Sequence, residues 1–578
     1  MSTLTEEPKW VYPKLDLKKQ KEIEREFNVH PLIASFFVSR GISSLEDVRY
    51  FLYARLPDLD EPSLFLAMEN SVRCVVEAIE QKKKILIYGD NDVDGMTGVA
   101  LLVEFLIKLG GDVDYVIFPP LLHRHKHFEA LQKIISEKQV KLLITVDCGI
   151  TSAKNLSYFV SQGTKVIITD HHEPLGVIPE NVLALNPKLP GQQKLNRDLT
   201  GVGVAFKLAH GITNYLVTEG KVNSKDIDLR YYLDLVALGT ISDMGVLLGE
   251  NRIFVRYGLQ QLRRTKRIGL SSLFSLIGLE KKDLTALDVA LKIAPRINSL
   301  GRIADPLKGL DLFLLKDKAK IDTLIKEIDV INVERQKLEQ SVFFSVDKII
   351  KENSNFLLNK ALVLSSSEWH PRVIPTVAAK MAKQYNRPVV IIAVMNGEAK
   401  GSIRSIKQFP LLNPLKKCSN FFINYGGHDF ASGIILEEKN IELFRKRFIH
   451  IANSSLRSQD IETKLYLDAE ASFKDLTYDL LSSLELLEPF GNDNPPPIFY
   501  SKVNKAWGPK QFGVNHLKLY LEQEGRILEG IAFGLGNKMS LLKKNANQPL
   551  FIAYTPQINR FYNKNSIQLL IRDIKIIE

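Results

Sequence analysis

The sequence has 578 residues, more than one typical domain, and its composition is that of a globular protein. With 45% hydrophobic and 25% charged residues, it is excluded from the fibrous and wholly disordered classes. A net charge of +11, from 77 Lys and Arg against 66 Asp and Glu, favours a polyanionic partner, nucleic acid first. Three widely spaced cysteines without a Cys-x-x-Cys pair exclude a thiolate zinc site and indicate a reducing compartment.

The N-terminal region carries no evident chemistry. Its first residues lack a basic segment followed by an apolar one, and no run of about 18 apolar residues occurs in the chain. We therefore expect a cytoplasmic protein with no membrane contact. Residues 1–80 mix polar helix-like segments with prolines, and we expect a helical cap there.

The most informative segment is residues 83–98, where a short apolar run, residues 85–88, precedes Asp90, Asp92 and Asp94. The run predicts a buried strand, and residues 99–109 predict an amphipathic helix, so the carboxylates lie at the carboxyl end of a strand. Carboxylates this close repel one another unless cations neutralise them, which indicates a metal site. From this segment alone, a helix cap with solvated neighbours is an equally good interpretation.

The same arrangement recurs further along the chain. Residues 142–146 and 165–169 predict strands, and an apolar run at residues 233–242 is expected to behave likewise. These segments are followed by Asp147, by Asp170, His171 and His172, and by Asp243. Because strands alternate with helices, we expect a parallel, doubly wound sheet whose carboxyl edge gathers these side chains. Carboxylates with one or two imidazoles suit Mn²⁺ or Mg²⁺.

Residues 89–95, 146–149, 170–172 and 239–243 resemble the four motifs of the DHH phosphoesterase superfamily. Residues 201–208, 249–252 and 294–302 extend the resemblance to the bacterial single-stranded-DNA exonucleases of that superfamily. The resemblance covers roughly residues 80–535, and the order of the motifs makes it specific.

The resemblance implies an α/β fold with two α/β domains, DHH and DHH-associated, joined by a long helix and followed by an OB-like β-barrel. The expected boundaries are 1–80 for the cap, 81–315 for the DHH domain, 316–352 for the helix, 353–455 for the DHH-associated domain and 456–578 for the barrel. Local patterns agree, because residues 317–351 have helical periodicity. Five short strands are expected at residues 498–503, 516–522, 527–533, 550–554 and 566–571.

In the expected barrel, aromatic residues alternate with lysines, a mixture typical of single-strand binding, although most of these aromatics would be core in any small barrel. They are Phe499, Tyr500, Trp507, Phe512 and Tyr520, with Lys502, Lys505, Lys510 and Lys518.

The activity implied by the resemblance is phosphodiester hydrolysis with two Mn²⁺ or Mg²⁺ ions, which releases 5′-mononucleotides from the 5′ end of single-stranded DNA in recombination and repair. The implied metal-binding residues are Asp90, Asp92, Asp94, Asp147, Asp170, His171 and Asp243, among which Asp90 and Asp170 alternatively orient the ligands. Asp147 and His172 are the expected catalytic residues, with His172 on the scissile phosphate or the leaving group. The implied substrate-binding residues are Arg296, Arg302, Ser402, Arg404, Gly426, Gly427 and His428, with Ser402 and Arg404 on the 5′-phosphate. A monomer is expected, with single-stranded-DNA-binding protein and helicases as partners.

Two departures from the family pattern bear on the substrate. Residues 119–128 lack the usual basic residue and E-G-Y-G-like loop, for which Arg124 or Lys126 are candidate replacements. Arg372 and Pro375 stand where glycines normally follow Trp369 and His370. Two other functions stay open: a DHH phosphodiesterase for short RNAs or cyclic dinucleotides, and a non-catalytic DNA-binding scaffold, which should have lost metal-binding carboxylates.

Overall fold

The computed structural model describes residues 7–119, 124–174, 176–192, 195–279, 284–395, 397–545, 548–561 and 564–576. The chain forms two units, of which the larger comprises residues 55–461 and 491–494. The smaller comprises residues 1–54, 462–490 and 495–578. Among the described residues, no helix is both long enough and apolar enough to cross a bilayer.

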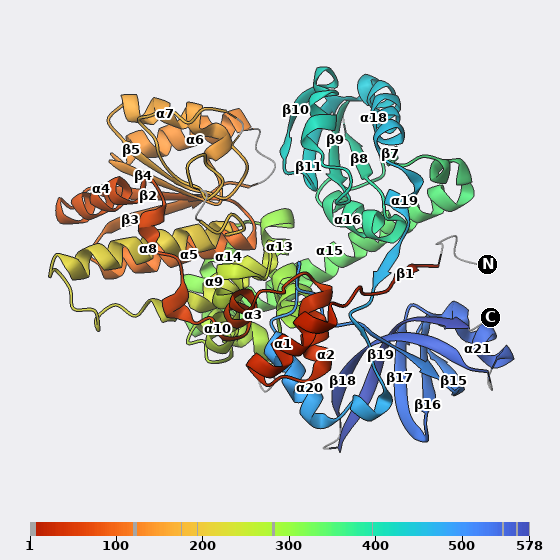
Figure 1. Ribbon diagram of the computed structural model, residues 1–578. Helices are drawn as coiled ribbons and strands as arrows, with labels where there is room; N and C mark the ends of the chain where they lie inside the picture. Colours follow the sequence, from red (N-terminus) through yellow and green to blue (C-terminus); the bar gives the residue numbers. More distant parts are fainter. Residues whose placement is uncertain are drawn as a thin grey trace. The chain divides into compact units, whose positions relative to one another are not determined.

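The larger unit begins with a parallel sheet in the order β3-β2-β4-β5-β6, which confirms the doubly wound prediction. Its strands are β2 (Lys84–Gly89), β3 (Asp112–Ile117), β4 (Leu142–Val146), β5 (Lys165–Thr169) and β6 (Leu183–Leu185). Side chains of β2 alternate between two cores, with Ile85 and Ile87 in one and Leu86 in the other. One face packs on α4 (Met68–Glu80), α5 (Val93–Lys108) and α8 (Gly201–Thr218), and the other on α6 (Arg124–Glu137) and α7 (Ala153–Ser161) (Figure 1).

Residues 233–242 form a helix, α9 (Leu233–Ser242), so the strand expected there was wrong. Every side chain from Leu233 to Ile241 is buried, and a helix that is buried all round shows the same unbroken apolar run as a buried strand. Asp243 caps the carboxyl end of this helix. The same core includes residues of α10 (Gly249–Arg263), α11 (Ile268–Leu276), α13 (Ala294–Ile303) and α14 (Leu307–Leu314).

The predicted long helix is confirmed as α15 (Lys318–Glu352), whose N-cap is Asp317. Its first half contributes Ile321 and Ile328 to the core of the first sheet. Its second half contributes Val346 and Ile350 to a separate core in the next domain. One continuous helix therefore supplies apolar residues to both domains of the larger unit.

The second sheet of the larger unit has the order β10-β11-β9-β8-β7, with only β7 and β8 parallel among its described pairs. Its two faces are covered by α16 (Ile374–Tyr385) and α18 (Ile441–Ser455), which belong to different cores. The strands are β7 (Leu362–Ser366), β8 (Val389–Met395), β9 (Glu398–Arg404), β10 (Phe422–Gly427) and β11 (Ala431–Glu437).

The smaller unit is built on a seven-stranded sheet in the order β13-β14-β18-β19-β17-β16-β15. Its strands are β13 (Ala469–Glu470), β14 (Phe499–Val503), β15 (Lys505–Phe512), β16 (His516–Gln523), β17 (Arg526–Phe533), β18 (Leu550–Phe561) and β19 (Lys564–Ile576). The five predicted strands are present. β15 was missed because Gly508 and Pro509 interrupt its pattern, and the β15–β16 register shifts between Trp507 and Lys510.

The N-terminal residues belong to this smaller unit. β1 (Lys9–Val11) pairs with β12 (Lys464–Tyr466), and Trp10 Nε1 donates to Asp573 Oδ2 at 2.7 Å. Helices α1 (Leu17–Phe27), α2 (Pro31–Ser39) and α3 (Leu45–Tyr53) follow β1. The five-part domain division expected from the sequence stays a prediction.

Candidate metal centre

Four chain segments bring carboxylates and imidazoles together at the carboxyl edge of the first sheet. They are the β2–α5 turn, the residues that follow β4, the residues that follow β5, and the end of α9. Their ligand-type atoms form three groups, each within 4.8 Å: Asp90, Asp92 and Asp147; Asp94, His171 and Asp243; and Asp147, His171 and His172. The predicted convergence of these side chains is therefore present in the structure.

Asp147 stands at the centre of this arrangement. Its backbone has φ of 58°, a left-handed conformation that is uncommon for residues other than glycine. Its Oδ1 is buried without a hydrogen-bond partner among the described residues and lies 3.1 Å from His171 Nε2. A buried carboxylate oxygen left in this way is costly unless a cation binds it.

Two neighbouring carboxylates start helix α5 and are held by backbone N–H groups. Asp92 is the N-cap, and its Oδ1 accepts hydrogen bonds from the Asp94 and Gly95 amides. Asp94 accepts from the amides of Gly201 at 2.7 Å and Val202 at 2.9 Å. These contacts fix the orientation of both carboxylates before any ligand binds.

Asp170 differs from Asp147, because nearby N–H groups already satisfy it. Its Oδ1 accepts from the His171 amide at 2.7 Å and from His172 Nδ1 at 2.7 Å, and its Oδ2 accepts from the Ile150 amide at 2.9 Å. Burial alone would raise the pKa of Asp170, but these hydrogen bonds and the charge of His172 lower it. Burial would likewise lower the pKa of His172, but the hydrogen bond to Asp170 raises it to about 9.

Four other carboxylates of the site, those of Asp90, Asp94, Asp147 and Asp243, are destabilised as anions. Burial, followed by the charge of Asp92, raises the pKa of Asp90 to about 6 and that of Asp94 to about 7. Burial and then the charge of Asp94 raise the pKa of Asp147 and Asp243 well above the usual range. Divalent cations would remove this repulsion, and carboxylate oxygens with imidazole form a donor set that suits Mn²⁺ or Mg²⁺. The residues present therefore fit the predicted metals.

The two histidine rings are in different states. Burial and the charge of His172 lower the pKa of His171 well below its usual value, which leaves the neutral imidazole that binds metals. His172 stacks on His428 of the second sheet domain with ring centroids 4.6 Å apart. Burial and the charge of His172 lower the pKa of His428 to about 3.

An open cavity of about 1490 Å³ adjoins the metal centre. From the first domain it is lined by residues that include Asp90, Asp147 and His172, and by Phe128 and Tyr158. From the second domain it is lined by residues of β9, β10 and β11, among them Lys400, Gly401, Tyr425, Gly426 and Gly427. A cavity with acidic residues at one place and lysines and aromatic rings elsewhere can take a phosphorylated, base-bearing ligand.

The predicted clamp residues lie on β9, beside this cavity and not among its described lining residues. Ser402 is 5% exposed, and its Oγ accepts a hydrogen bond from Arg404 Nη1 at 3.2 Å. Both side chains therefore lie on one side of β9. Arg296 on α13 contacts Asp329 of α15, with Nε to Oδ1 at 3.4 Å. The side chain of Arg302 is outside the described part of the structure.

The altered loop is only partly described. Residues 120–123 and the side chain of Arg124 lie outside the described residues, while Lys126 is exposed. His127 follows in α6, stacks on Phe118 with centroids 5.1 Å apart and lines the cavity. At the other departure, Arg372 Nη1 donates to the Ile303 carbonyl at 2.5 Å, at the end of α13.

The sequence reasoning missed Asn298, which connects two of the motifs. Its Oδ1 accepts from the Val93 amide at 3.1 Å, and its Nδ2 donates to Ser242 Oγ at 3.1 Å, beside Asp243. The only sequence signal was its place within residues 294–302. The cavity residues Tyr425, Phe128 and Tyr158 were also missed, because an aromatic residue carries no positional signal before the fold is known.

Comparison with known proteins agrees with this site. Family models match in chain order: the DHH family N-terminal domain at residues 84–240, the DHHA1 domain at residues 358–454 and the RecJ OB domain at residues 467–573. The single-stranded-DNA-specific exonuclease RecJ of Bacillus subtilis is 31% identical over 579 residues, which cover 100% of this chain and 72% of that protein. The chain belongs to the RecJ family.

Other members of the RecJ family extend the comparison. The Escherichia coli RecJ is 29% identical, with 94% of this chain and 96% of that protein covered. The crystal structure of Thermus thermophilus RecJ in complex with Mn²⁺ superposes with a TM-score of 0.83 at 28% identity and covers 99% of this chain and 80% of that one. The same RecJ has also been solved in complex with Mg²⁺, with a TM-score of 0.75 at 26% identity.

Proposed function

We propose that the protein is a metal-dependent exonuclease that is specific for single-stranded DNA, acts from the 5′ end and releases 5′-mononucleotides. The observation that carries the proposal is Asp147, whose buried Oδ1 has no hydrogen-bond partner among the described residues and lies among five further carboxylates and two histidines. A non-catalytic scaffold would have no use for such a site, and every carboxylate of the predicted set is present. The names of the relatives support the choice of substrate.

We propose that two divalent cations, Mn²⁺ or Mg²⁺, are bound by Asp92, Asp94, Asp147, His171 and Asp243. Asp90 would lie beside these ligands, at the edge of the metal centre. Bound cations of this kind neutralise phosphate charge and lower the pKa of a bound water. Asp170 orients His172, because three backbone or imidazole N–H groups at 2.7 to 2.9 Å already occupy its oxygens.

His172 has the geometry of a phosphate-contacting acid. Its Nδ1 is fixed by Asp170, so Nε2 is the nitrogen available to a ligand. Its raised pKa keeps the ring protonated near neutral pH, and the stacked His428 limits its rotation. A fixed N–H donor of this kind stabilises charge on a phosphate oxygen or protonates the leaving oxygen.

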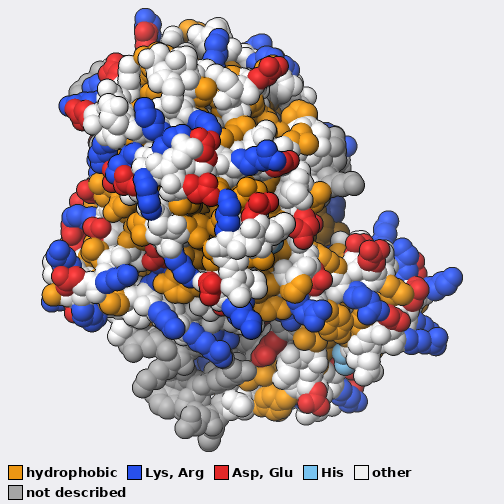
Figure 2. Space-filling model, turned by 90° about the vertical axis from the view of Figure 1, so that its left-hand side faces the viewer, with side chains coloured by type: hydrophobic (Ala, Val, Ile, Leu, Met, Phe, Trp, Pro, Cys, Tyr) orange, Lys and Arg blue, Asp and Glu red, His pale blue; other side chains and the backbone are white. Residues whose placement is uncertain are grey.

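The DNA path is assigned to the cavity beside the metal centre. Lys400, Lys154 and the backbone of Gly426 and Gly427 line it, and Ser402 with Arg404 would hold the terminal 5′-phosphate. Arg296 and Arg302 on α13 would contact the following phosphates. On the face drawn in Figure 2, basic side chains are interspersed with acidic and hydrophobic ones, so net charge alone does not mark the path there.

The smaller unit offers a second contact surface for single strands. On the outward face of β15 and β16, Trp507 and Tyr520 stack with centroids 6.2 Å apart, and Lys510 pairs in register with Lys518. Phe499, by contrast, is fully buried in the core of the sheet. Exposed rings beside lysines bind bases and phosphates of a flexible strand without sequence preference.

The cellular setting of the proposal is DNA recombination and repair in the cytoplasm. The expected form is a monomer that acts with single-stranded-DNA-binding protein and helicases.

The test is Mn²⁺-dependent digestion of a 5′-phosphorylated, 3′-labelled single strand, beside a blunt duplex and short RNAs. Progressive shortening from the 5′ end is expected, and Asp147→Asn should abolish it. Asp112→Asn is the matched control, because Asp112 is an exposed carboxylate of the same sheet that pairs with Lys84 at 2.6 Å. Cleavage confined to oligomers of a few nucleotides would indicate the small-substrate phosphodiesterase, and tight binding without cleavage would indicate the scaffold.

A further inference from the structure

An asparagine outside the proposed ligand set connects two elements that carry ligands. Asn298 belongs to α13, and its side chain bonds both to the start of α5 and to the end of α9. Its Oδ1 accepts a hydrogen bond from the Val93 amide, and its Nδ2 donates one to Ser242 Oγ, each at 3.1 Å. The orientation of the side-chain amide is unambiguous, because a backbone N–H can only donate. Asn298 therefore uses both ends of its amide to hold two separate segments.

The bond to Val93 completes the first turn of α5. Val93 is the first residue of this helix, so its N–H has no partner within the helix. The next two N–H groups, those of Asp94 and Gly95, donate to Asp92 Oδ1. Asn298 supplies the acceptor for the N–H of Val93. This bond therefore fixes the backbone between Asp92 and Asp94, both of which are proposed metal ligands.

The bond to Ser242 bears on a third proposed ligand. Ser242 is the last residue of α9, and Asp243 follows it as the C-cap. Among the described groups of ligand-type atoms, Asp243 occurs in one, together with Asp94 and His171. A shift of α9 relative to α5 would change the distance between the Asp243 and Asp94 carboxylates. The side chain of Asn298 bonds to both helices and opposes such a shift.

Helix α13, which carries Asn298, is itself packed tightly. Its residues Ile297 and Leu300 are fully buried in the core of the first sheet. Gly301 lies so close to the β2–α5 turn that an added Cβ would collide with the Asn91 carbonyl oxygen. A supporting residue holds ligands in place only when its own position is fixed by packing. Asn298 meets this condition.

We propose that Asn298 is a positioning residue of the metal centre, which sets the distance between Asp94 at the start of α5 and Asp243 at the end of α9. The inference rests on the proposed metal-dependent function. It adds a residue that is assigned neither to a metal nor to DNA, since Asn298 is not among the described lining residues of the cavity beside the metal centre. Residues that orient metal ligands typically contribute about 10- to 100-fold to metal affinity or activity.

The experiment is isothermal titration calorimetry of Mn²⁺ into the metal-free full chain, without DNA. The native chain is expected to bind two Mn²⁺ ions. Asn298→Ala should bind one of them about 10- to 100-fold more weakly. Ser242→Ala removes only the bond to α9 and should weaken the same ion to a smaller extent. Adding Ser242→Ala to Asn298→Ala should cause little further loss, because both substitutions remove the same hydrogen bond.

Digestion of single strands separates positioning from substrate binding. At a fixed Mn²⁺ concentration, Asn298→Ala should lower kcat about 10- to 100-fold. KM for the DNA should stay within about twofold of the native value, because no contact with substrate has been removed. Melting temperatures measured without Mn²⁺ show whether each variant is folded. Should Asn298→Ala be unfolded, Ser242→Ala decides, since it keeps the bond to Val93.

Asn453→Ala is the matched control within the larger unit. Asn453 is an exposed residue of α18 that makes the same pair of bonds as Asn298. Its Oδ1 accepts from the Lys360 amide at 2.8 Å, and its Nδ2 donates to Asn359 Oδ1 at 3.1 Å. None of these residues belongs to the metal centre. The control variant should therefore bind Mn²⁺ and digest DNA as the native chain does.

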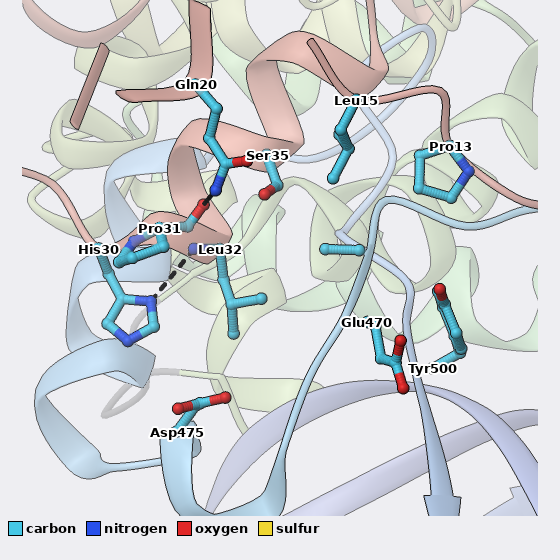
Figure 3. A pocket seen from close by; sticks show the side chains of 11 residues that line it. Pro13, Leu15, Gln20, His30, Pro31, Leu32, Ser35, Glu470, Asp475 and Tyr500 are labelled. Carbon is cyan, nitrogen blue, oxygen red and sulfur yellow. Dashed lines mark hydrogen bonds between the residues drawn. The ribbon is translucent and has the colours of Figure 1, made fainter. Parts of the chain in front are cut away.

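A second control accounts for Mn²⁺ bound elsewhere. Glu470 and Asp475 line a cavity of the smaller unit (Figure 3), and Asp475 Oδ2 already accepts a hydrogen bond from the Ser472 amide at 3.0 Å. Glu470→Gln removes the exposed carboxylate of this pair and should leave Mn²⁺ binding unchanged. The calorimetric signal then reports on the metal centre.

Three results would overturn the proposal. They are a Mn²⁺ affinity of Asn298→Ala or of a folded Ser242→Ala equal to that of Asn453→Ala, fully additive losses in the double variant, and a rise in KM with unchanged kcat. A native chain that binds no Mn²⁺ would overturn the proposed function and this inference together. Native-like binding by both the native chain and Asn298→Ala would overturn the inference alone.

Discussion

Gly201→Ala tests how the activity depends on the packing of the metal centre, because the substitution leaves the charges of the site unchanged. Gly201 is the first residue of α8, and a Cβ added there would lie 2.4 Å from the Asp147 Cβ and 2.6 Å from its Oδ1. The Gly201 amide also donates to Asp94 at 2.7 Å. A single methyl group therefore displaces the Asp147 carboxylate, whose Oδ1 has no hydrogen-bond partner in the described part of the chain, without changing any charge in the site.

The expected magnitude follows from those distances. Carbon atoms in contact are normally about 3.5 to 4.0 Å apart, so Asp147 or α8 must move by roughly 1 Å. A displacement of this size in a catalytic group costs about 100-fold in rate, and overpacking a well-filled site costs about 1–3 kcal/mol of stability. We expect Gly201→Ala to lose about 100-fold in nuclease activity and to melt at a lower temperature.

Gly203→Ala is the control on the same helix turn. There the nearest atom to an added Cβ is Leu199 Cδ2 at 3.3 Å, the end of a flexible side chain. Alanine improves helix propensity by up to about 1 kcal/mol, so this variant should be as stable as the native chain or more so, and fully active. The assays are Mn²⁺-dependent digestion of single strands and thermal melting with and without Mn²⁺. Activity of Gly201→Ala within a fewfold of Gly203→Ala would refute the packing argument.

Three further predictions concern other parts of the larger unit. Lys207→Met should destabilise the protein by about 3–5 kcal/mol in chemical denaturation, because it leaves Glu250 buried without its ion pair, while Lys207→Met with Glu250→Leu should recover most of the loss. Burial lowers the pKa of His210 from 6.5 to about 4, so the unfolded chain binds the proton more tightly and native stability falls between about pH 6.5 and 4. Relative to His210→Gln, this loss should reach about 1–3 kcal/mol in pH-dependent melting, and parallel pH profiles would contradict it. Arg372→Ala removes the hydrogen bond from Arg372 to the Ile303 carbonyl at the end of α13. We expect it to raise KM for single-stranded DNA several-fold, with little change in kcat or melting temperature. An unchanged KM would show that this hydrogen bond does not affect DNA binding.

The first sheet could be predicted from sequence because its strands are short apolar runs bounded by glycine and aspartate, as at residues 85–88 and 142–146. The strand predicted at residues 233–242 was wrong because the same kind of apolar run forms helix α9 there. An apolar run specifies burial, and burial is shared by a central strand and a central helix. β15 was missed because Gly508 and Pro509 do not fit a strand pattern. They are tolerated there because β15 is the edge strand of the sheet and its register shifts at these residues.

The convergence of the side chains that follow β2, β4 and β5 could also be predicted, because the carboxyl ends of neighbouring parallel strands meet at one edge of the sheet, whereas Asp243 joins them from the end of helix α9. Asn298 could not, since an asparagine that joins two loops has no spacing that identifies it. Nor could the stacking of His428 on His172, which depends on how the two domains of the larger unit pack.

Asp147 and Asp170 differ in their hydrogen-bond partners, which the sequence does not specify. Both follow a buried parallel strand, and the sequence predicts Asp147 as a metal ligand and Asp170 as either a metal ligand or a residue that orients the ligands. In the structure, Asp170 faces the amides of Ile150 and His171 and the ring of His172, so its charge is fully hydrogen-bonded and its pKa is lowered. The backbone of Asp147 is left-handed, and its Oδ1 is buried where this oxygen accepts no hydrogen bond from the described residues. The pKa of Asp147 is raised. The same residue type at the same place in the fold therefore holds a histidine by hydrogen bonds in one case and, in the proposed metal centre, binds a cation in the other, and the local supply of N–H donors decides which.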